Sequence, residues 1–398
     1  MATVYSKSTS IISFMACGLL ACAVASAHPD DELPGAVAAK IDAIAKAWVE
    51  AGKSAGVAVG VARDGQVVFA RGYGYANLDD KVPVTPDTVF RAGSIQKQFT
   101  AAAVLLLAER GKLSLDDSLA KYFPDIPQSQ AASIRQLLNH TAGLHNLSDG
   151  AGADPQVLRQ LRLGLSQAEI LELIKSLNPL YDFAPGTAFH YSNTGYMLAG
   201  MIVEKVSGQS LRDFLQANIF SKHGMASTAV DNDHDIVPHR AQGYDRAPGR
   251  PGAFQHTAFF SMHAAQWSGG LRTTVGDLLR WQQALLSGRV IGQKLLREMT
   301  SPARLRDGRR TSEGVWPPGE RARGDYGYGL YFLEIAGHKQ IIHGGGVNGF
   351  GAVASTSVDD QLSFVVLTNT TEGLSSPDGE VWIKIAQALL SNQKARKP

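Results

Sequence analysis

Three short segments of the sequence carry side chains that together could perform an acyl transfer. They are Ser94-Ile95-Gln96-Lys97, Tyr191-Ser192-Asn193 and His343-Gly344-Gly345-Gly346. They supply a hydroxyl nucleophile, an amine and a phenol that can carry protons, and an amide that can bind a polar substrate. The glycines allow backbone to approach a ligand closely. None of the three is specific alone, so the prediction depends on their order and setting.

Ser94 and Lys97 stand three residues apart at the start of a predicted helix, so their side chains share one face. A serine hydroxyl needs a nearby proton acceptor, and lysine accepts a proton only when its pKa is lowered. Burial and the positive end of the helix dipole would both lower it. The same dipole favours the oxyanion that forms when Ser94 attacks a carbonyl group. We expect the backbone amides of Ser94 and Gly346 to form the oxyanion hole.

Similar patterns elsewhere in the chain lack this setting. Ser118-Lys121 follows two aspartates in a short polar-flanked segment, and Ser391-Lys394 lies in the polar C-terminal tail. We interpret both as ordinary serines with exposed lysines. The tyrosine and asparagine of Tyr75-Ala76-Asn77 precede Ser94 and break the order.

Tyr191 and Asn193 are alternate residues, and alternate residues of an extended segment point the same way. We therefore expect both to face one cleft. A neighbouring lysine ammonium would favour the phenolate of Tyr191 and make it a proton shuttle, while Asn193 would bind a substrate amide. The other interpretation is a buried tyrosine with a capping asparagine. His343 has two interpretations as well, a structural residue or a part of the site.

Other chemistries fit the sequence less well. Gly52-Lys53-Ser54-Ala55-Gly56 matches the GxSxG pattern, but it follows a predicted helix and precedes a strand, whereas a nucleophile elbow needs strand, turn and helix. The eleven histidines show no metal-binding spacing. No phosphate loop or dinucleotide fingerprint precedes a helix. With a formal net charge of +2 and no basic stripe, a nucleic-acid partner is excluded. We expect no metal and no cofactor.

The elements that must position these residues fall into strands, then helices, then strands. A helix over 35–51 precedes two strands, 57–63 and 66–75, joined by an Asp64-Gly65 turn. The segment 98–110 is apolar on nearly all sides, which predicts a buried helix. Further helices are expected at 134–138, 167–177, 195–206, 274–286 and 381–390, and late strands at 328–334, 340–343, 351–357 and 361–368.

The simplest assembly joins the early hairpin and the late strands in one sheet. We predict an α/β part, residues 33–93 and 268–398, and an inserted all-α part, residues 94–267. Together they form one hydrolase domain over residues 28–398, an antiparallel sheet flanked by helices with an inserted helical domain.

The first residues are typical of a targeting signal. Lys7 precedes an apolar stretch, 11–24, that ends in Ala25-Ser26-Ala27. We expect a signal peptide over residues 1–27 and an exported protein, periplasmic or secreted; the alternative is an uncleaved anchor. Leu19-Leu20-Ala21-Cys22 also resembles a lipoprotein box, so a lipid on Cys22 is a further alternative that would attach the protein to a membrane. Cleavage after Ala27 would remove both cysteines of the chain.

One loop, residues 301–325, is rich in arginine. It carries Arg304, Arg306, Arg309, Arg310, Arg321 and Arg323. We interpret it as a solvated surface loop; the alternative is a lip that attracts acidic substrates.

Taken together, the motifs resemble those of the serine β-lactamase and penicillin-binding protein superfamily, in its class C-like branch. The likeness extends from about residue 35 to 395. It rests on the three segments and on Pro86–Ser94, Leu137–Leu144 and Gly269-Gly270-Leu271. It implies an α/β domain packed against a helical domain, with the site at their junction.

By this resemblance Ser94 is the nucleophile, Lys97 its base, Tyr191 a second acid and base, and Asn193 a substrate contact. His343, with Gly345 and Gly346, would line the substrate strand, and His343 stands where class C β-lactamases carry a lysine. A neutral histidine binds a β-lactam carboxylate more weakly. The HxG relatives include D,D-peptidases, D-aminopeptidases and amidases, and esterases, so the expected partner is a small-molecule or peptide substrate. The alternative function is a non-catalytic penicillin-recognising binding or sensor protein. The oligomeric state is left open.

Overall fold

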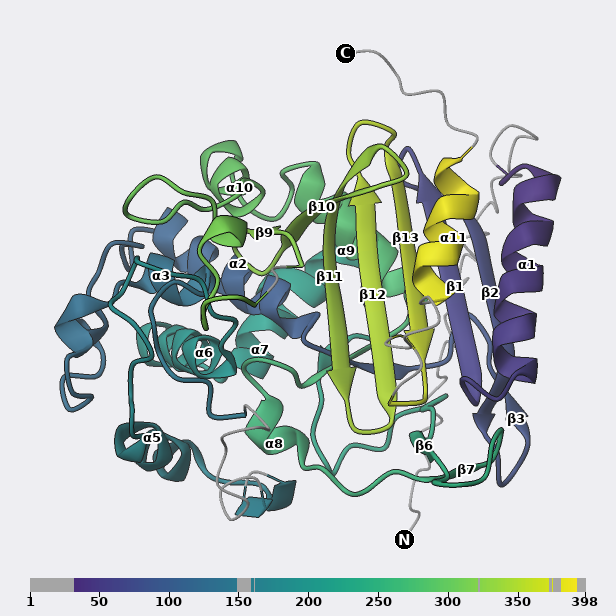
Figure 1. The fold of residues 1–398 in the computed structure, drawn as a ribbon, viewed down its shortest axis with the longest axis horizontal. Helices are drawn as coiled ribbons and strands as arrows, with labels where there is room; N and C mark the ends of the chain where they lie inside the picture. The colour runs from purple at the N-terminus through teal and green to yellow at the C-terminus, as the bar shows by residue number, and fades with distance from the viewer. Residues whose placement is uncertain are drawn as a thin grey trace, which may run out of the picture. The chain divides into compact units, whose positions relative to one another are not determined.

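An antiparallel sheet of eight strands joins the beginning and the end of the chain (Figure 1). Its order is β3-β2-β1-β13-β12-β11-β10-β9, so the early hairpin lies beside the last strand, as predicted. The strands are β1 (Gly56–Arg63), β2 (Gln66–Asn77), β3 (Val82–Pro83), β9 (Asp325–Tyr326), β10 (Tyr331–Ile335), β11 (His338–Val347), β12 (Phe350–Ser357) and β13 (Leu362–Thr368).

The computed structural model describes residues 32–148, 159–160, 162–320, 323–371, 374 and 381–391. The predicted signal peptide, Cys22 and Arg321 lie outside these residues. Residues Leu33–Pro398 cluster as one compact unit, and the predicted division at residues 94 and 268 stays a prediction. Within the described part of the chain, none of the helices combines the length and apolar character needed to span a membrane.

The hairpin of β1 and β2 turns where the sequence predicts. Asp64 and Gly65 have φ of 49° and 79°, the left-handed values that a two-residue turn between twisted strands requires.

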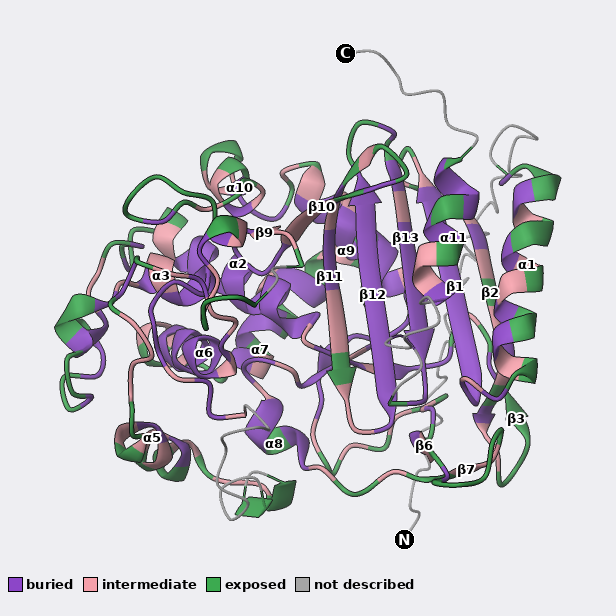
Figure 2. Ribbon diagram, viewed as in Figure 1, coloured by how far each residue is buried: buried purple, intermediate pink, exposed green. Residues whose placement is uncertain are grey.

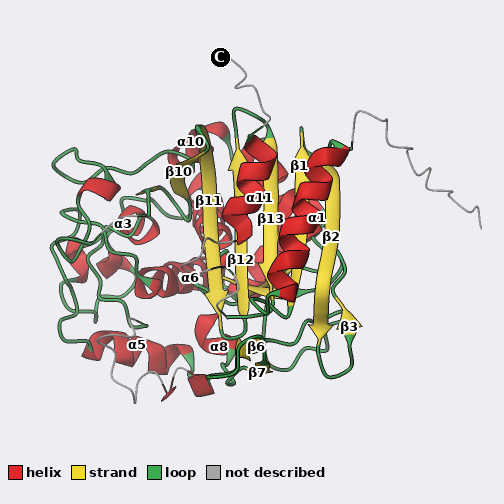
Figure 3. Ribbon diagram, turned by 45° about the vertical axis from the view of Figure 1, so that its right-hand side comes forward, coloured by secondary structure: helices red, strands yellow, loops and turns green. Residues whose placement is uncertain are grey.

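Helices cover both faces of the sheet. Helices α1 (Gly35–Glu50) and α11 (Val381–Leu390) pack against each other over one face (Figure 3). Helix α9 (Val275–Leu286) packs on the other face against β1 and β13. Because it is covered on both sides, β12 is buried along its whole length (Figure 2).

The region between the two halves of the sheet is mostly helical. Its α-helices are α2 (Gln96–Glu109), α3 (Ile134–Leu138), α5 (Gln167–Ser176), α6 (Asn193–Ser207), α7 (Leu211–Leu215) and α8 (Met262–Ala265), and α10 (Gln293–Met299) follows α9. Shorter turns of helix occur at Leu119–Lys121, Ser129–Ala131, Gln216–Phe220, Ser221–His223 and Thr311–Glu313. Helix α2 is buried from Gln96 through Leu107, as its apolar sequence predicts.

Short strands connect the helical region to the large sheet. A three-stranded sheet has the order β4-β8-β5, formed by β4 (Phe90–Gly93), β5 (Ala229–Val230) and β8 (Leu271–Thr273). A separate hairpin contains β6 (Tyr244–Arg246) and β7 (Phe254–His256). Strand β4 packs against β11 and β12, and it ends one residue before Ser94.

Candidate active site

Glycines bring the start of α2 against strand β11. Gly93 has a φ of 51°, and a Cβ on it would lie 2.6 Å from the backbone nitrogen of Gly346. A Cβ on Gly345 would lie 1.9 Å from the carbonyl oxygen of Ala92. Only glycine fits at either position, because a larger residue would collide with backbone atoms. The chain around Ser94 therefore lies directly beside the glycine strand, and the assignment of the oxyanion hole to the amides of Ser94 and Gly346 stays a prediction.

Lys97 is fully buried and is held by three oxygen atoms. Its Nζ lies 3.1 Å from Ser94 Oγ, 2.6 Å from Asn193 Oδ1 and 2.8 Å from the carbonyl oxygen of Ser268. Burial holds the pKa of Lys97 well below its ordinary value. A neutral amine has two N–H donors and one lone pair. Because Asn193 Oδ1 and the Ser268 carbonyl can only accept, they take both donors and leave the lone pair for the hydroxyl of Ser94.

Tyr191 lines the same cavity as Ser94. Lys97 Nζ lies 4.8 Å from the centre of its ring. Burial raises the pKa of Tyr191 above 10, with a further contribution from Tyr331. The expectation that a lysine ammonium would favour the phenolate is therefore wrong, because burial opposes the charged form of both groups. In this arrangement Tyr191 is a neutral phenol that can donate a proton.

Asn193 is the first residue of α6, and Ser192 caps that helix by accepting from the Gly195 amide. The predicted extended segment thus ends at Ser192. Asn193 still reaches the site, with Oδ1 on Lys97 and Nδ2 donating to Ser148 Oγ at 2.6 Å. Both polar atoms of the Asn193 side chain thus have protein partners, Lys97 for Oδ1 and Ser148 for Nδ2. Its contact with substrate stays a prediction.

His343 is buried, and both of its ring nitrogens have protein partners. Nδ1 donates to the Gly344 carbonyl, and Nε2 accepts from the hydroxyl of Tyr326 at 2.9 Å. Burial, together with the charge of Lys97, lowers the pKa of His343 to about 3. The ring is therefore neutral and tied to the protein, although it lines the same cavity as Ser94 and Tyr191.

Two cavities meet at Ser94. One, of about 470 Å³, is lined by Tyr191, Tyr331 and the His343–Gly346 strand together with Arg323. The other, of about 340 Å³, is lined by Asn193 and Ser268 together with Arg162. The described residues around these cavities include one arginine in each and no aspartate or glutamate.

The arginines of the loop 301–325 therefore differ in their surroundings. Arg306 donates to the Pro185 carbonyl, and Arg309 pairs with Asp307, as expected of a solvated loop. Arg323 instead lines the larger cavity, where its charge acts on Tyr191, Tyr331 and His343. For this one residue the structure favours the alternative of a basic lip.

The competing motifs have ordinary structural contacts. Ser118 accepts from the amide of Ala120, and Lys121 pairs with Asp117. Ser54 is buried and donates to the Gly56 carbonyl. Tyr75 is an exposed residue of β2. Lys394 lies outside the described residues.

Several residues at the site were not predicted. Ser268 contributes a backbone carbonyl, which no sequence pattern marks. Tyr326 and Ser148 contact predicted site residues, and the sequence carries no spacing that would have singled them out. Arg323 was noted, but composition alone did not distinguish it from the other arginines.

The fold and this site define a serine hydrolase of the β-lactamase class. Residues 41–388 match the family model described as Beta-lactamase, and the chain belongs to that family. It is 29% identical over 321 residues to penicillin-binding protein 4* of Bacillus subtilis, covering 78% of this chain and 67% of the relative. It is 28% identical to a D-aminopeptidase of Brucella anthropi, covering 81% of this chain and 58% of the relative. The chain thus spans little more than half of that enzyme.

Solved structures agree with this assignment. The D-amino acid amidase from Ochrobactrum anthropi SV3, complexed with L-phenylalanine amide, has a TM-score of 0.75 and 26% identity, covering 90% of this chain and 99% of the amidase. The octameric penicillin-binding protein homologue from Pyrococcus abyssi has a TM-score of 0.73 and 26% identity, covering 90% of this chain and 78% of the homologue.

Proposed function

We propose that this protein hydrolyses its substrates through an acyl-serine intermediate on Ser94. The observation that carries the proposal is the amine of Lys97, whose two donors are taken by Asn193 and Ser268 and whose remaining face meets Ser94 Oγ at 3.1 Å. A lysine held in this way is suited to accept the serine proton.

The reaction would proceed in two halves. Ser94 Oγ attacks the substrate carbonyl carbon while its proton passes to Lys97, and Tyr191 donates its own proton to the leaving group as the acyl bond breaks. The proton gained by Lys97 replaces the one lost by Tyr191, so both groups are neutral again. Water then attacks the acyl ester, the oxygen of Ser94 takes back a proton, and a carboxylic acid is released.

Covalent labelling tests this proposal. Intact-protein and peptide mass spectrometry after exposure to a fluorophosphonate, and separately to a penicillin, should show one adduct on Ser94. Ser94→Ala should abolish the adduct and turnover, whereas Ser54→Ala, the matched control, should keep both. Labelling elsewhere, or none with either probe, would sink the proposal. An adduct with no turnover of any ester, peptide or cephalosporin would favour the penicillin-recognising binding protein instead.

We further propose that the acyl substrates are neutral or anionic: a β-lactam, a D-peptide with a free carboxylate, or an ester. Each cavity beside Ser94 is lined by one arginine and, among the described residues, by no carboxylate. An α-ammonium group there would meet like charge, which disfavours binding. A panel of nitrophenyl esters, nitrocefin, acyl-D-Ala-D-Ala and D-amino acid amides should rank the amides last. If the D-amino acid amides were the best substrates, the assignment of neutral or anionic substrates would be wrong.

We also propose that the chain is exported after removal of residues 1–27, supported by its Lys7, apolar and Ala-Ser-Ala pattern. After fractionation of an expression host, mass spectrometry of the protein found outside the cytoplasm should show that its chain begins at His28. A lipid-modified Cys22 would instead establish the lipoprotein alternative.

A further inference from the structure

The larger cavity at Ser94 continues around the edge of β11 onto the opposite face of the sheet. Successive residues of a strand point to opposite faces, yet all four residues of His343–Gly346 line this cavity. It passes around β11 beyond its pairing with β10, since the last described pair on that side is Tyr331 with Ile342. One continuous cavity therefore connects Ser94 with the face of the sheet that α11 covers.

The far part of this cavity is apolar. Arg323, which is exposed, is the one charged side chain among the described residues that line it. The remaining wall belongs to, or packs against, the hydrophobic cluster between the sheet and helices α1 and α11. It is formed by Tyr331, Leu333, Ile342, Val353, Leu374 and Trp382. Of these, Tyr331, Leu333 and Trp382 are half-buried, so they have surface to offer to a bound group.

Gly344 keeps the cavity open although the packing does not require a glycine there. A Cβ on Gly344 would have the Ala352 carbonyl oxygen as its nearest neighbour, at the ordinary contact distance of 3.7 Å, whereas a Cβ on Gly345 would collide with backbone. Gly344 pairs with Val353, and directly paired residues share one face of a sheet. Because Val353 lines the cavity, the missing side chain of Gly344 leaves room in the cavity.

Tyr191 indicates which part of the substrate enters this cavity, a step that rests on the proposed function. A proton donor must come within hydrogen-bond reach of the atom that it protonates, and Tyr191 is the proposed donor to the leaving group. It lines the larger cavity and is absent from the described lining of the smaller one. The leaving group therefore departs into the larger cavity, and the acyl group faces the smaller cavity.

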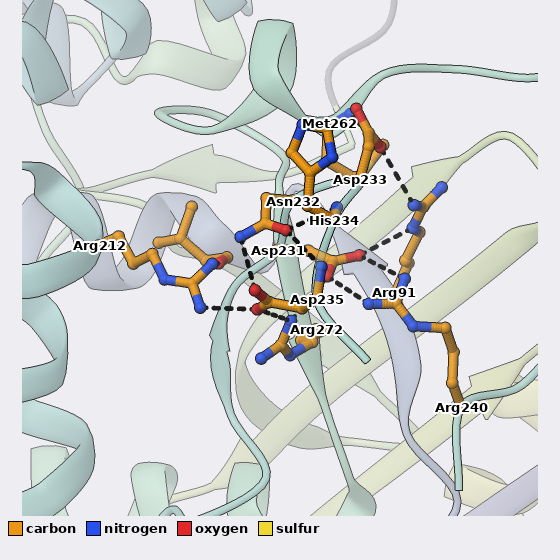
Figure 4. A network of polar contacts seen from close by, with 11 residues as sticks. Arg91, Arg212, Asp231, Asn232, Asp233, His234, Asp235, Arg240, Met262 and Arg272 are labelled. Atoms are coloured by element: carbon orange, nitrogen blue, oxygen red, sulfur yellow. Dashed lines mark hydrogen bonds and ion pairs between the residues drawn. The ribbon is translucent and has the colours of Figure 1, made fainter. Parts of the chain in front are cut away.

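The smaller cavity has its own wall, on the side of helix α8. Ala264 and Ala265 of this helix line it. The helix begins beside Asp233, which accepts from the Met262 amide and lies 3.7 Å from a terminal nitrogen of Arg91 (Figure 4). These contacts hold the acyl side of the site independently of β10 and α11. Substitutions can therefore address each cavity separately.

We propose that the larger cavity receives a bulky apolar leaving group, so that the preferred substrates are esters of apolar alcohols at least as large as benzyl alcohol. Its volume of about 470 Å³ is that of a pocket for a small organic molecule. A methyl leaving group would leave the surface of Leu333 and Trp382 in contact with water. A larger apolar group removes that surface from water, which stabilises the transition state of acylation relative to the free enzyme and substrate.

Three simple esters test the proposal, with kcat/KM of the full mature chain as the measurement. Methyl acetate and benzyl acetate form the same acetyl-enzyme, and their alcohols have similar acidity, so their difference reports contacts of the leaving group. We expect benzyl acetate to exceed methyl acetate at least about tenfold. Methyl phenylacetate is an isomer of benzyl acetate that carries the ring on the acyl side, so its ring should enter the smaller cavity.

Two substitutions in the larger cavity should reduce the preference for benzyl acetate over methyl acetate. Gly344→Val, which fills the cavity with a side chain that strands favour, should lower it about tenfold. Leu333→Asn, which replaces an apolar side chain by a polar one of similar size, should lower it severalfold. Val347→Thr is the matched control, because Val347 lines the smaller cavity. It should keep the preference for benzyl acetate and change the rate of methyl phenylacetate.

Hydrolysis of all three esters without a preference for benzyl acetate would overturn this inference and leave the acyl-serine proposal standing. That comparison needs no variant, so it decides the matter even if Gly344→Val does not fold. A benzyl preference that survives both Gly344→Val and Leu333→Asn would overturn it as well. So would a loss in these variants that falls on methyl phenylacetate, because the acyl group would then occupy the larger cavity. If no ester is hydrolysed and a fluorophosphonate does not label Ser94, both proposals fail.

Discussion

Lys97 and Asn193 meet at 2.6 Å, between Nζ of the lysine and Oδ1 of the asparagine. The other end of the asparagine amide is fixed by Ser148, so its oxygen cannot turn away from the amine. In the proposed mechanism Asn193 therefore assists the base: it accepts one N–H of Lys97 and so directs the lone pair of the amine towards Ser94.

Asn193→Asp should raise the pKa of Lys97, because a carboxylate beside the amine favours the ammonium form. The acid limb of kcat/KM should move upward by about one to three pH units, with at least a tenfold loss at pH 7. Steady-state rates across pH measure this shift. Ser148→Ala, which keeps the charge balance, should leave the limb close to its original position, and an unmoved limb in Asn193→Asp would refute the role of the asparagine.

The wild-type rate should rise with pH and then stay level. Lys97 must be neutral to act as a base, so activity is lost as pH falls through its lowered pKa. Tyr191 must be protonated to act as an acid, and its raised pKa keeps it so up to pH 10. A kcat profile on an ester stable to base measures both limbs. An alkaline loss centred near pH 8 would contradict the proposed acid.

Lys97→Met should abolish turnover and at the same time stabilise the fold. Burial lowers the pKa of Lys97 in the folded state, so the unfolded state binds the proton more tightly and folding carries the cost of releasing it. This cost grows as pH falls below 10.5, the ordinary pKa. Chemical unfolding should show Lys97→Met more stable than wild type at pH 7, by about 1 kcal/mol or more, with the gap closing near pH 10. A less stable variant at both pH values would be the contrary result.

His343 should make the protein sensitive to acid. Its pKa is about 3 in the folded protein against an ordinary value of 6.5, so the unfolded state binds a proton first as pH falls. Stability is therefore lost between pH 6.5 and 3. Urea unfolding at pH 7 and pH 4 should show a smaller loss for His343→Gln than for wild type. Some loss should remain, because the buried His140 also has a lowered pKa. An equal loss in both proteins would count against a neutral His343.

The two glycines of the substrate strand should differ sharply in their tolerance. A Cβ on Gly345 would meet the Ala92 carbonyl oxygen at 1.9 Å, whereas on Gly346 its nearest neighbour is the Phe350 carbonyl oxygen at 4.0 Å. Gly345→Ala should therefore cost about 1–3 kcal/mol of stability and displace Ser94, with loss of activity. Gly346→Ala should keep the fold. Tm and kcat/KM of the pair give the comparison, and similar values would contradict the packing described.

Short sequence patterns predicted most of the helices and strands of the fold. The Asp64-Gly65 turn is encoded within a few residues, and helix α2 is apolar on nearly every side. The start of α6 was misplaced by two residues, although Ser192 is a standard cap whose hydroxyl signals the true beginning. The direction of the Tyr191 pKa was missed because it depends on burial, which long-range packing decides. Ser268 acts through a carbonyl that every residue possesses, and Arg323 differs from its neighbours only in where the folded loop places it.

The strand order β1-β13-β12-β11 also has a consequence for biosynthesis. The nucleophile is translated early, but the glycine strand beside it is held in the sheet by β12 and β13, which leave the ribosome near the end of synthesis. A nascent chain carrying Ser94, Lys97 and Tyr191 therefore has no assembled site until residue 368 is available to pair with Val57. The order of the strands thus delays assembly of the site until late in translation.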